Sequence, residues 1–238
     1  MAREMGLEPL SVIMMMQRDN NIETTAKRFV KDGVKDVASA IKGAQDIIAE
    51  TVSEDERSRQ TVRNAFKREA IITSKVVKSK ENSEEAAKFS DYFDFSEPLK
   101  RCSSHRLLAM RRGENEGILR ISISPNDDEC TEKIKRNFVR GFNKCSSFVS
   151  EAVEDSYKRL LKPAIETEFS KLSKEKADEE AINVFAENLR QLLLSAPLGQ
   201  KRVMGVDPGF RTGCKVVCLD EQGNLLHHEA IFPHPPVN

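Results

Sequence analysis

The sequence predicts a mainly α-helical protein with a small α/β insert, followed by the first three antiparallel strands of a further α/β domain. Apolar residues recur at helical steps through most of residues 1–200. Residues 71–125 interrupt that pattern with strand-like runs and a group of aromatic residues. After residue 201, three β-type runs follow one another, separated by short turns. These observations define four segments, 1–70, 71–125, 126–200 and 201–238.

Residues 1–70 are expected to form a helical region. "EPLSVIMMMQ" opens with Glu-Pro, which suits a first helical turn, and "NIETTAKRFV" is followed by the helix stop Gly33. "DVASAIKGAQDIIAETV" has apolar residues at three- and four-residue steps. Ser53 with Glu56 three residues later has the form of a capping box, so a new helix is predicted to start there.

Residues 71–125 are predicted to form a small mixed insert. "AIITSKVVK" and "GILRISIS" have strand character, since the second alternates Leu119, Ile121 and Ile123 with polar residues. Between the two runs, "FSDYFDF" places four aromatics in seven residues. The helix that follows is expected to be capped by Ser103 or Ser104.

Helical periodicity returns in residues 126–200. Pro163 is expected to break or restart its helix, because proline lacks an amide hydrogen and crowds the preceding turn. A last helix from about Lys174 to Ser195 has an apolar stripe made of Ile182, Phe185, Ala186, Leu189, Leu192 and Leu193. Residues 201–238 then give the strands "RVMGVD", "CKVVCLD" and "LLHHEAIF", with "DEQGN" as a hairpin turn.

Composition limits the class of protein. The chain has 238 residues with 38 Lys+Arg and 38 Asp+Glu, so any electrostatic contact with a partner must be local. No apolar stretch reaches the roughly 18 residues of a membrane-spanning helix, and the start lacks a signal-peptide pattern. Five cysteines without tight pairs indicate a reducing compartment. We therefore expect a soluble, cytoplasmic protein with no membrane partner.

Several blocks carry a resemblance to a known family. "VMGVDPGFRTGCKV" followed by "GNLLHHEAIFPHPP" closely resembles the start of the YqgF domain in the Tex family of bacterial transcription accessory proteins. "AREMGLEPL", "KFSDYFDFSEP", "SHRLLAMRRGENEGIL" and "FAENLRQLLLSAP" resemble the Tex central region. The resemblance implies a ribonuclease H-like YqgF fold, truncated here after three strands. Tex proteins continue into helix-hairpin-helix modules and an oligonucleotide-binding barrel, so an interior piece of a longer protein is expected.

Asp207 is the candidate catalytic residue of the longer protein. By resemblance it matches the first carboxylate of ribonuclease H-like enzymes, on the first strand, with Gly205 leaving room beside it. A two-metal nuclease needs several carboxylates around cations roughly 3.5–4 Å apart. Later segments would supply the others, because Asp220 and Glu221 belong to the hairpin turn at the opposite end of the sheet. This chain alone is therefore not expected to be an enzyme.

Two other kinds of site are weighed for the C-terminal strands. "GVDPGFRTG" also resembles the phosphate-binding hairpin of actin-like kinases and ATPases, where backbone amides of Gly209, Arg211 and Gly213 could face an anion. Cys214 and Cys218 share a strand face, and zinc with His227 or His228 is conceivable. Close Cys-x-x-Cys spacing is missing, so buried free thiols are expected, and no metal or other cofactor. Mg²⁺ enters only under the nuclease alternative.

Three basic clusters are candidates for phosphate contact. They are Lys67, Arg68, Lys75, Lys78 and Lys80; Lys100, Arg101, Arg106, Arg111 and Arg112; and Lys133, Lys135, Arg136, Arg140 and Lys144. Interleaved acidic residues favour a solvated helix face for any single cluster. The middle cluster is the best candidate because aromatics that could stack on bases precede it. The expected nucleic-acid-binding residues are Arg101, His105, Arg106, Arg111 and Arg112.

The leading interpretation is a fragment of a Tex-like nucleic-acid-binding protein associated with transcription or RNA handling. It would act as a helical scaffold for nucleic-acid-binding modules, with RNA or DNA and the transcription machinery as partners. Two alternatives stay open: part of a metal-dependent, structure-selective nuclease with Asp207 as first metal ligand, and a protein-interaction scaffold. The unpaired edge of a three-stranded sheet also predicts that the strands pack on the helical region or pair with another copy.

Overall fold

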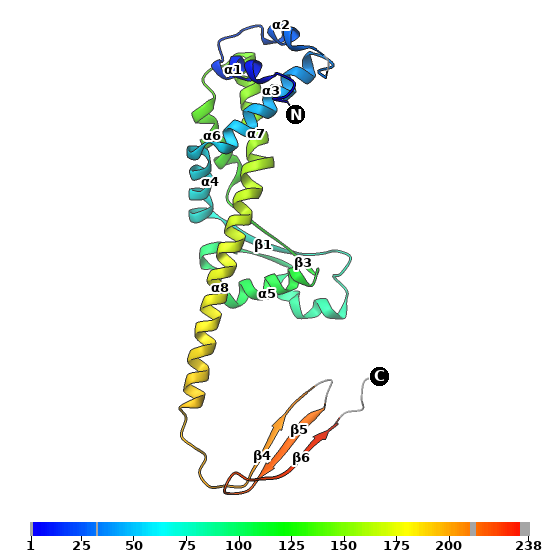
Figure 1. Ribbon diagram of the computed structural model, residues 1–238, viewed down its shortest axis with the longest axis vertical. Coiled ribbons are helices and arrows are strands. Elements are labelled where there is room, and N and C mark those ends of the chain that lie inside the picture. The colour runs from blue at the N-terminus through cyan, green and yellow to red at the C-terminus, as the bar shows by residue number, and fades with distance from the viewer. Residues whose placement is uncertain (1, 32, 210–212, 234–238) are drawn as a thin grey trace. The chain divides into compact units, whose positions relative to one another are not determined.

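The computed structural model describes residues 2–31, 33–209 and 213–233. The contacts divide the chain into two units, residues 1–184 and 185–238, which are described separately. The first unit combines helices with a three-stranded sheet, and the second contains another three-stranded sheet (Figure 1). The predicted fold class is confirmed. Within the described ranges, no helix has both the length and the apolar character needed to cross a membrane.

Residues 8–69 form a succession of helices. Their bounds are α1 (Glu8–Met16), α2 (Ile22–Ala26), the 3₁₀ turn η1 (Lys27–Phe29), α3 (Val37–Glu54) and α4 (Glu56–Glu69). The predicted apolar face of α3 is buried, with Ile47 and Ile48 at 3% and 1% exposure. Together with α7, α3 contributes to the larger of two clusters of buried residues.

The start of α4 differs from the prediction. Asp55 is the N-cap, and its carboxylate accepts hydrogen bonds from the amide of Ser58 at 2.8 Å and from the Ser58 hydroxyl at 2.9 Å. The Ser53 hydroxyl donates instead to the carbonyl of Glu50 at 2.8 Å, inside the last turn of α3. The predicted capping box at Ser53 is therefore wrong, because a carboxylate two residues later caps the next helix.

The insert is a sheet with strand order β2-β1-β3, antiparallel throughout. Its elements are β1 (Ile71–Val76), the 3₁₀ helix η2 (Glu84–Tyr92), β2 (Asp94–Pro98), the 3₁₀ turn η3 (Leu99–Arg101), α5 (Ser104–Asn115) and β3 (Leu119–Ser124). Both predicted strands are confirmed. Ser103 occupies the N-cap position of α5, but its hydroxyl accepts from Arg106 Nε and makes no capping hydrogen bond. The strand β2 was not predicted, because pairing with β1 and not apolar alternation makes "DFSEP" extended.

Helices return as α6 (Asp127–Phe138), α7 (Lys144–Ser156), the π-helical turn η4 (Tyr157–Leu161) and α8 (Lys162–Leu193). Pro163 does not break the helix, but the α-helical pattern restarts at Lys162 after the π turn, and the last helix begins there instead of at Lys174. The π turn widens the helix directly before Pro163. The helix therefore continues through Pro163, and the widened turn accommodates the missing proline amide without ending the helix.

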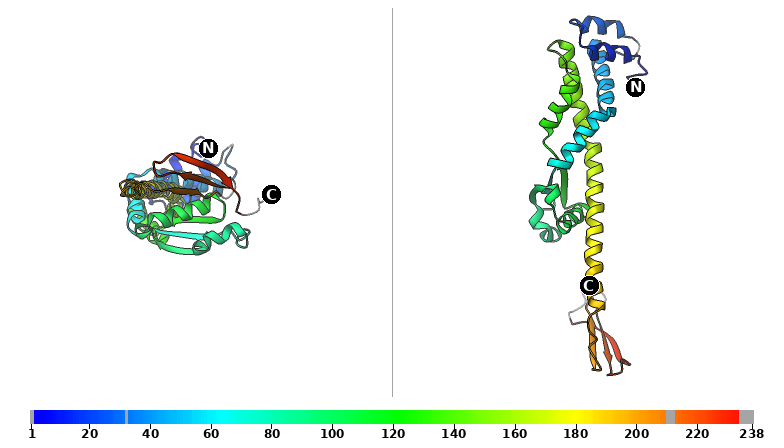
Figure 2. Two further views of the ribbon diagram at one scale, coloured as in Figure 1. Left: turned by 90° about the horizontal axis from the view of Figure 1, so that it is seen from below. Right: turned by 90° about the vertical axis from the view of Figure 1, so that its left-hand side faces the viewer.

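Within the first unit, α8 runs past α4 and the sheet (Figure 2) and forms hydrogen bonds with both. Arg63 of α4 forms a two-nitrogen contact with the carboxylate of Glu168, with its Nε 3.0 Å from Oε1. Glu166 accepts a hydrogen bond from the amide of Ile123 at 2.8 Å, on the side of β3 that has no neighbouring strand. This bond satisfies a donor on the sheet edge and fixes α8 beside it.

Asp127 joins β3, α6 and α8 in one hydrogen-bonded junction. Its Oδ1 accepts from the hydroxyls of Tyr157 at 2.7 Å and Ser124 at 2.8 Å, and its Oδ2 accepts from Lys162 Nζ at 2.5 Å. Burial opposes ionisation of Asp127, but these hydrogen bonds together outweigh it and hold the pKa of Asp127 below its ordinary value. The Tyr157 ring is fully buried, and that burial together with the bond to Asp127 raises the pKa of its hydroxyl.

The junction predicts a pH dependence of stability. Because the folded-state pKa of Asp127 is depressed, its contribution is present above the unfolded-state value near 3.8 and disappears as pH falls through the lower folded value. We expect Asp127→Asn to be less stable than the unchanged chain at pH 7, with the difference shrinking as pH falls below about 4. Urea unfolding at several pH values measures this. Parallel stability curves for the two proteins would contradict it.

The second sheet has strand order β4-β5-β6, with bounds β4 (Val203–Asp207), β5 (Cys214–Leu219) and β6 (Leu225–Ile231). All three predicted strands are confirmed, and both pairings are antiparallel. In the turn after β5, the carboxylate of Asp220 accepts from the amides of Gln222 at 2.9 Å and Asn224 at 2.7 Å. Asp220 therefore has the local turn role that was predicted.

Candidate nucleic-acid interface

Two of the five predicted nucleic-acid-binding residues are held by partners inside the fold. Arg106 Nη1 lies 2.9 Å from Glu97 Oε2, so α5 is tied to β2. Arg111 Nη1 lies 2.7 Å from Glu114 Oε2, and its Nη2 donates to the Ser170 hydroxyl of α8 at 2.5 Å. The Arg111 side chain is only 13% exposed. These guanidinium groups stabilise the insert, whatever else they contact.

The other three residues of the predicted set are exposed. Arg101 ends η3, while His105 and Arg112 lie seven residues apart in α5 and therefore share one helix face. Neither Arg101 nor Arg112 forms an ion pair with any described residue, and the His105 ring nitrogen lies 3.4 Å from the Ser103 hydroxyl. We call Arg101, His105 and Arg112 the exposed α5 set. The aromatics before them instead pack against the buried clusters, with Tyr92 and Phe95 rings 5.7 Å apart.

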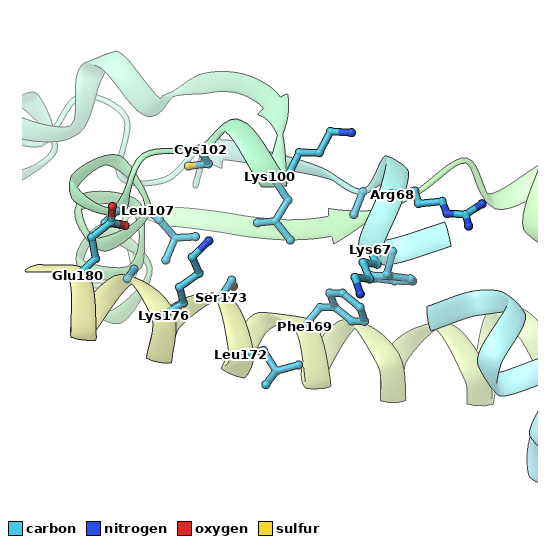
Figure 3. A pocket seen from close by; sticks show the side chains of 15 residues that line it. Lys67, Arg68, Lys100, Cys102, Leu107, Phe169, Leu172, Ser173, Lys176 and Glu180 are labelled. Atoms are coloured by element: carbon cyan, nitrogen blue, oxygen red, sulfur yellow. The ribbon is translucent and has the colours of Figure 1, made fainter. Parts of the chain in front are cut away.

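A basic groove lies between the end of α4, η3, the start of α5 and α8, and encloses about 310 Å³ (Figure 3). Its cationic lining residues are Lys67, Arg68, Lys100 and Lys176. Apolar side chains form the rest of its wall, among them Leu99, Leu107 and Phe169. Figure 3 shows Lys176 pointing from α8 toward Leu107 and Cys102, with Phe169 projecting into the space beside Lys67. All of these residues belong to the first unit.

Sequence reasoning missed the groove. It assigned Lys67 and Arg68 to one basic cluster and Lys100 to another, and it did not single out Lys176. In the sequence these residues are separated by more than thirty positions on either side of Lys100. No local pattern reports their convergence, because the path of α8 past α4 and α5 brings them together.

The third basic cluster is largely neutralised by neighbouring carboxylates. Lys135 Nζ lies 2.7 Å from Glu154 Oε1 and 3.1 Å from Glu132 Oε1, and these bonds outweigh burial to raise the pKa of Lys135. Lys144 is 3.0 Å from Glu23, and Lys133 is 3.6 Å from Glu129. The solvated, ion-paired face that interleaved acids favour is the arrangement found here.

Asp207 is exposed at the end of β4, directly opposite Lys215 of β5. A Cβ atom added at Gly205 would meet nothing within 4 Å, so the expected space beside Asp207 is present. In the described part of the chain, no three His, Cys, Asp or Glu side chains gather as a metal site would require. Asp220 follows Leu219, which pairs with Val203, and so lies at the other end of the sheet from Asp207.

The phosphate-binding alternative falls partly outside the described residues. Arg211 is one of the residues not described, and Gly209 is half-buried just before that gap. Gly213 has a φ of +77°, and a Cβ there would lie 2.7 Å from the Phe232 ring and 2.9 Å from the Ile231 carbonyl. Close packing of β6 therefore already explains a glycine at position 213.

The cysteines show no ligand arrangement among the described residues. Cys218 is directly opposite His227, whereas His228 pairs with Val217 and so lies on the other face. Cys214 and Cys218 are half-buried, and Cys130 and Cys145 are buried free thiols. Burial raises the pKa of Cys102, at the wall of the basic groove, to about 12. A raised pKa disfavours the thiolate, which is the reactive form of cysteine.

Comparisons with known proteins agree with the two parts of the chain. The family model described as Tex central region-like matches residues 17–185, and the Tex protein YqgF-like domain matches residues 201–238. The chain is 41% identical to the uncharacterized protein YdcI of Bacillus subtilis and 35% identical to the transcriptional accessory protein Tex of Neisseria gonorrhoeae, with 100% of this chain covered in both.

A human relative, S1 RNA-binding domain-containing protein 1, is 30% identical over 98% of the chain. The chain spans 33% of YdcI, 32% of the Neisseria protein and 24% of the human protein. It therefore corresponds to about a third of its bacterial relatives. Since the central-region match alone covers most of the chain, this protein belongs to the Tex family.

Proposed function

We propose that this chain is the helical scaffold of a Tex-like nucleic-acid-binding protein and touches nucleic-acid phosphates through the exposed α5 set. Relatives named for transcriptional accessory function and for an S1 RNA-binding domain support the association with nucleic acid. The observation that carries the contact is the presence of Arg101 and Arg112 without acidic partners among the described residues, next to two arginines that have them. An exposed, unpaired guanidinium is free to bind a phosphate oxygen.

The scaffold role rests on how the first unit is tied together. The bonds of Glu166 to Ile123 and of Glu168 to Arg63 fix α8 to the sheet and to α4. Arg111 adds a bond between α5 and Ser170 of α8. A recognition surface on α5 is thereby held on rigid elements, which is the arrangement that binding sites need. Transcription machinery as a further partner is part of the same proposal.

We propose no catalytic role for this chain by itself. Asp207 is exposed, and its partner across the sheet is Lys215, not a second acid. A two-metal mechanism needs further carboxylates converging on the same cations. The nuclease alternative therefore depends on residues that the complete protein would have to supply. Pairing of the free edges of β4 and β6, within this protein or with another copy, stays a prediction.

Binding of fluorescent single-stranded RNA and duplex DNA, measured by anisotropy between 50 and 200 mM salt, tests the proposal. We expect salt-dependent binding, with the slope for a single strand reduced by about 1.4 in Arg101→Ala/Arg112→Ala, since each lost phosphate contact removes about 0.7. The control Arg18→Ala/Arg57→Ala removes equal charge at exposed positions outside the insert and is expected to bind like the unchanged chain.

The same samples with Mg²⁺ test the absence of catalysis. We expect intact strands from the unchanged chain and from Asp207→Asn alike. Binding without salt dependence, or identical binding by the Arg101→Ala/Arg112→Ala protein, would remove the α5 contact and favour the protein-interaction scaffold. Cleavage that disappears in Asp207→Asn would establish the nuclease alternative instead.

A further inference from the structure

The four cations of the basic groove form no ion pair with any residue the structure describes, and we infer that the groove binds one phosphate-bearing nucleotide unit. Lys67, Arg68, Lys100 and Lys176 come from three separate elements, and none of them forms an ion pair or hydrogen bond through its side chain with a residue the structure describes. The ammonium groups of Lys67 and Lys176 lie along the groove, whereas the charged ends of Arg68 and Lys100 point away from α8 (Figure 3). Like charges along one cavity wall give it a positive potential. A bound phosphate would be attracted by that potential and gain charge-assisted hydrogen bonds.

The pairing pattern on α8 shows that Lys176 is exceptional. Two lysines of this helix pair with an acid four residues later: Lys171 with Glu175 at 3.8 Å and Lys174 with Asp178 at 2.5 Å. By the same spacing, Glu180 would pair with Lys176.

Glu180 is engaged elsewhere. Its carboxylate accepts a hydrogen bond from the hydroxyl of Ser104, the first residue of α5. That position favours a carboxylate, because the amides of a helix start carry partial positive charge. Glu180 thus lies at one end of the groove and leaves Lys176 without an ion-pair partner among the described residues. Figure 3 shows how the two side chains are oriented.

The remaining wall suits a planar, weakly polar group next to the phosphate. Phe169 projects into the groove, and the centroid of its ring lies 5.3 Å from that of the Phe66 ring. Leu99 and Leu107 line the cavity as well. Aromatic side chains stack on unpaired bases, whereas duplex DNA hides its base faces. A volume of about 310 Å³ is at the small end of ligand pockets, which accommodates one nucleotide and not a longer strand.

The ligand chemistry is therefore a 5′-phosphorylated nucleoside, free or within a single strand. Whether the bound unit is a free nucleotide or part of a single strand rests on the proposed function. Nucleotide binding by the groove does not rest on it. It is separate from the exposed α5 set, because Arg101, His105 and Arg112 do not line it. The two sites can be removed independently, and the failure of one does not imply the failure of the other.

Uridine 5′-monophosphate, ribose 5-phosphate, uridine and an eight-residue oligouridylate serve as probes in calorimetric and NMR titrations of the whole chain. We expect the monophosphate to bind more tightly than ribose 5-phosphate or uridine and to shift the amide signals of Ser173 and Lys100. Lys67→Ala/Lys100→Ala/Lys176→Ala should weaken this binding at least about tenfold, as loss of charged hydrogen bonds does. The salt slope of oligouridylate binding should fall by about 0.7, because the groove neutralises one phosphate of the strand.

The control Lys78→Ala/Lys171→Ala/Lys174→Ala removes the same charge outside the groove and should leave both titrations unchanged. Phe169→Leu keeps an apolar wall and should bring monophosphate and ribose 5-phosphate to equal affinity.

Equal weakening by the two triple variants, or shifts confined to α5, would overturn the groove while leaving the α5 contact standing. Monophosphate binding without oligouridylate binding would keep the groove, assign it to free nucleotides and remove the proposed function. An acidic peptide that outcompetes the monophosphate would overturn the nucleotide assignment.

Discussion

Replacing Tyr157 with alanine is expected to lower the free energy of unfolding by about 3–5 kcal/mol, the usual cost of truncating a buried aromatic residue. Tyr157 is fully buried in the larger cluster and lies in the π turn that leads into α8. Alanine would leave a cavity and also remove the hydroxyl that binds Asp127. Urea unfolding followed by circular dichroism measures the change.

A second substitution separates the two contributions. Tyr157→Phe keeps the ring and removes only the hydroxyl, so we expect a loss of about 1–3 kcal/mol from the weakened junction. Tyr92→Phe is the matched control, because its ring is half-buried and its hydroxyl makes no hydrogen bond with a described residue. That control should change stability by less than about 0.5 kcal/mol. If Tyr157→Phe is as stable as the unchanged chain, the hydrogen bond between Tyr157 and Asp127 contributes nothing to stability.

Gln17→Ala is expected to destabilise the chain by about 2–4 kcal/mol. Gln17 is 8% exposed and binds the end of α6 and the residues just after it with both ends of its side-chain amide. Its Nε2 donates to the Phe138 carbonyl at 2.6 Å, and its Oε1 accepts from the Arg140 amide at 2.8 Å. Alanine would leave these two backbone groups without their partner. Thermal and urea unfolding both report the loss.

Backbone strain gives this prediction an internal check. Gln17 has a φ of +54°, a left-handed conformation that costs a non-glycine residue about 1–2 kcal/mol. Gln17→Gly should therefore be about 1 kcal/mol more stable than Gln17→Ala, although both lose the amide bonds. Gln60→Ala, which removes only an exposed bond to Asn64 within α4, should be nearly neutral. Equal stability of the glycine and alanine variants would show that strain at this position is negligible.

Local pattern was sufficient to identify most of the α-helical segments and five of the strands in the described residues, but not the 3₁₀ helix η2. The buried face of α3 and the alternation of β3 follow directly from the spacing of their apolar residues. Local pattern failed at boundaries where several residues compete for one role. Ser53 and Asp55 could both cap α4, and the carboxylate does so. At Pro163 a π turn, which no propensity reports, keeps the helix continuous.

The candidate sites were harder to predict, because the effect of a charged residue depends on its partners. The sequence gives no means of separating Arg101 from Arg106, yet one is exposed and the other lies 2.9 Å from Glu97. Likewise, Lys174 and Lys176 occur in the same charged stretch, and only Lys174 has an ion-pair partner among the described residues. Partners distant in sequence decide which charges remain available for a ligand.

The sequence by itself determined the family, most of the helical and strand segments, and the position of Asp207 at the end of a first strand. The family follows from the resemblance of whole sequence blocks, whereas the segments follow from residue spacing along the chain, and neither requires any knowledge of packing. The tertiary structure alone decided which cations are neutralised, and it assembled the basic groove from residues 67–68, 100 and 176. Burial and electrostatic pairing act through space, so they become readable only once α4, α5 and α8 lie side by side.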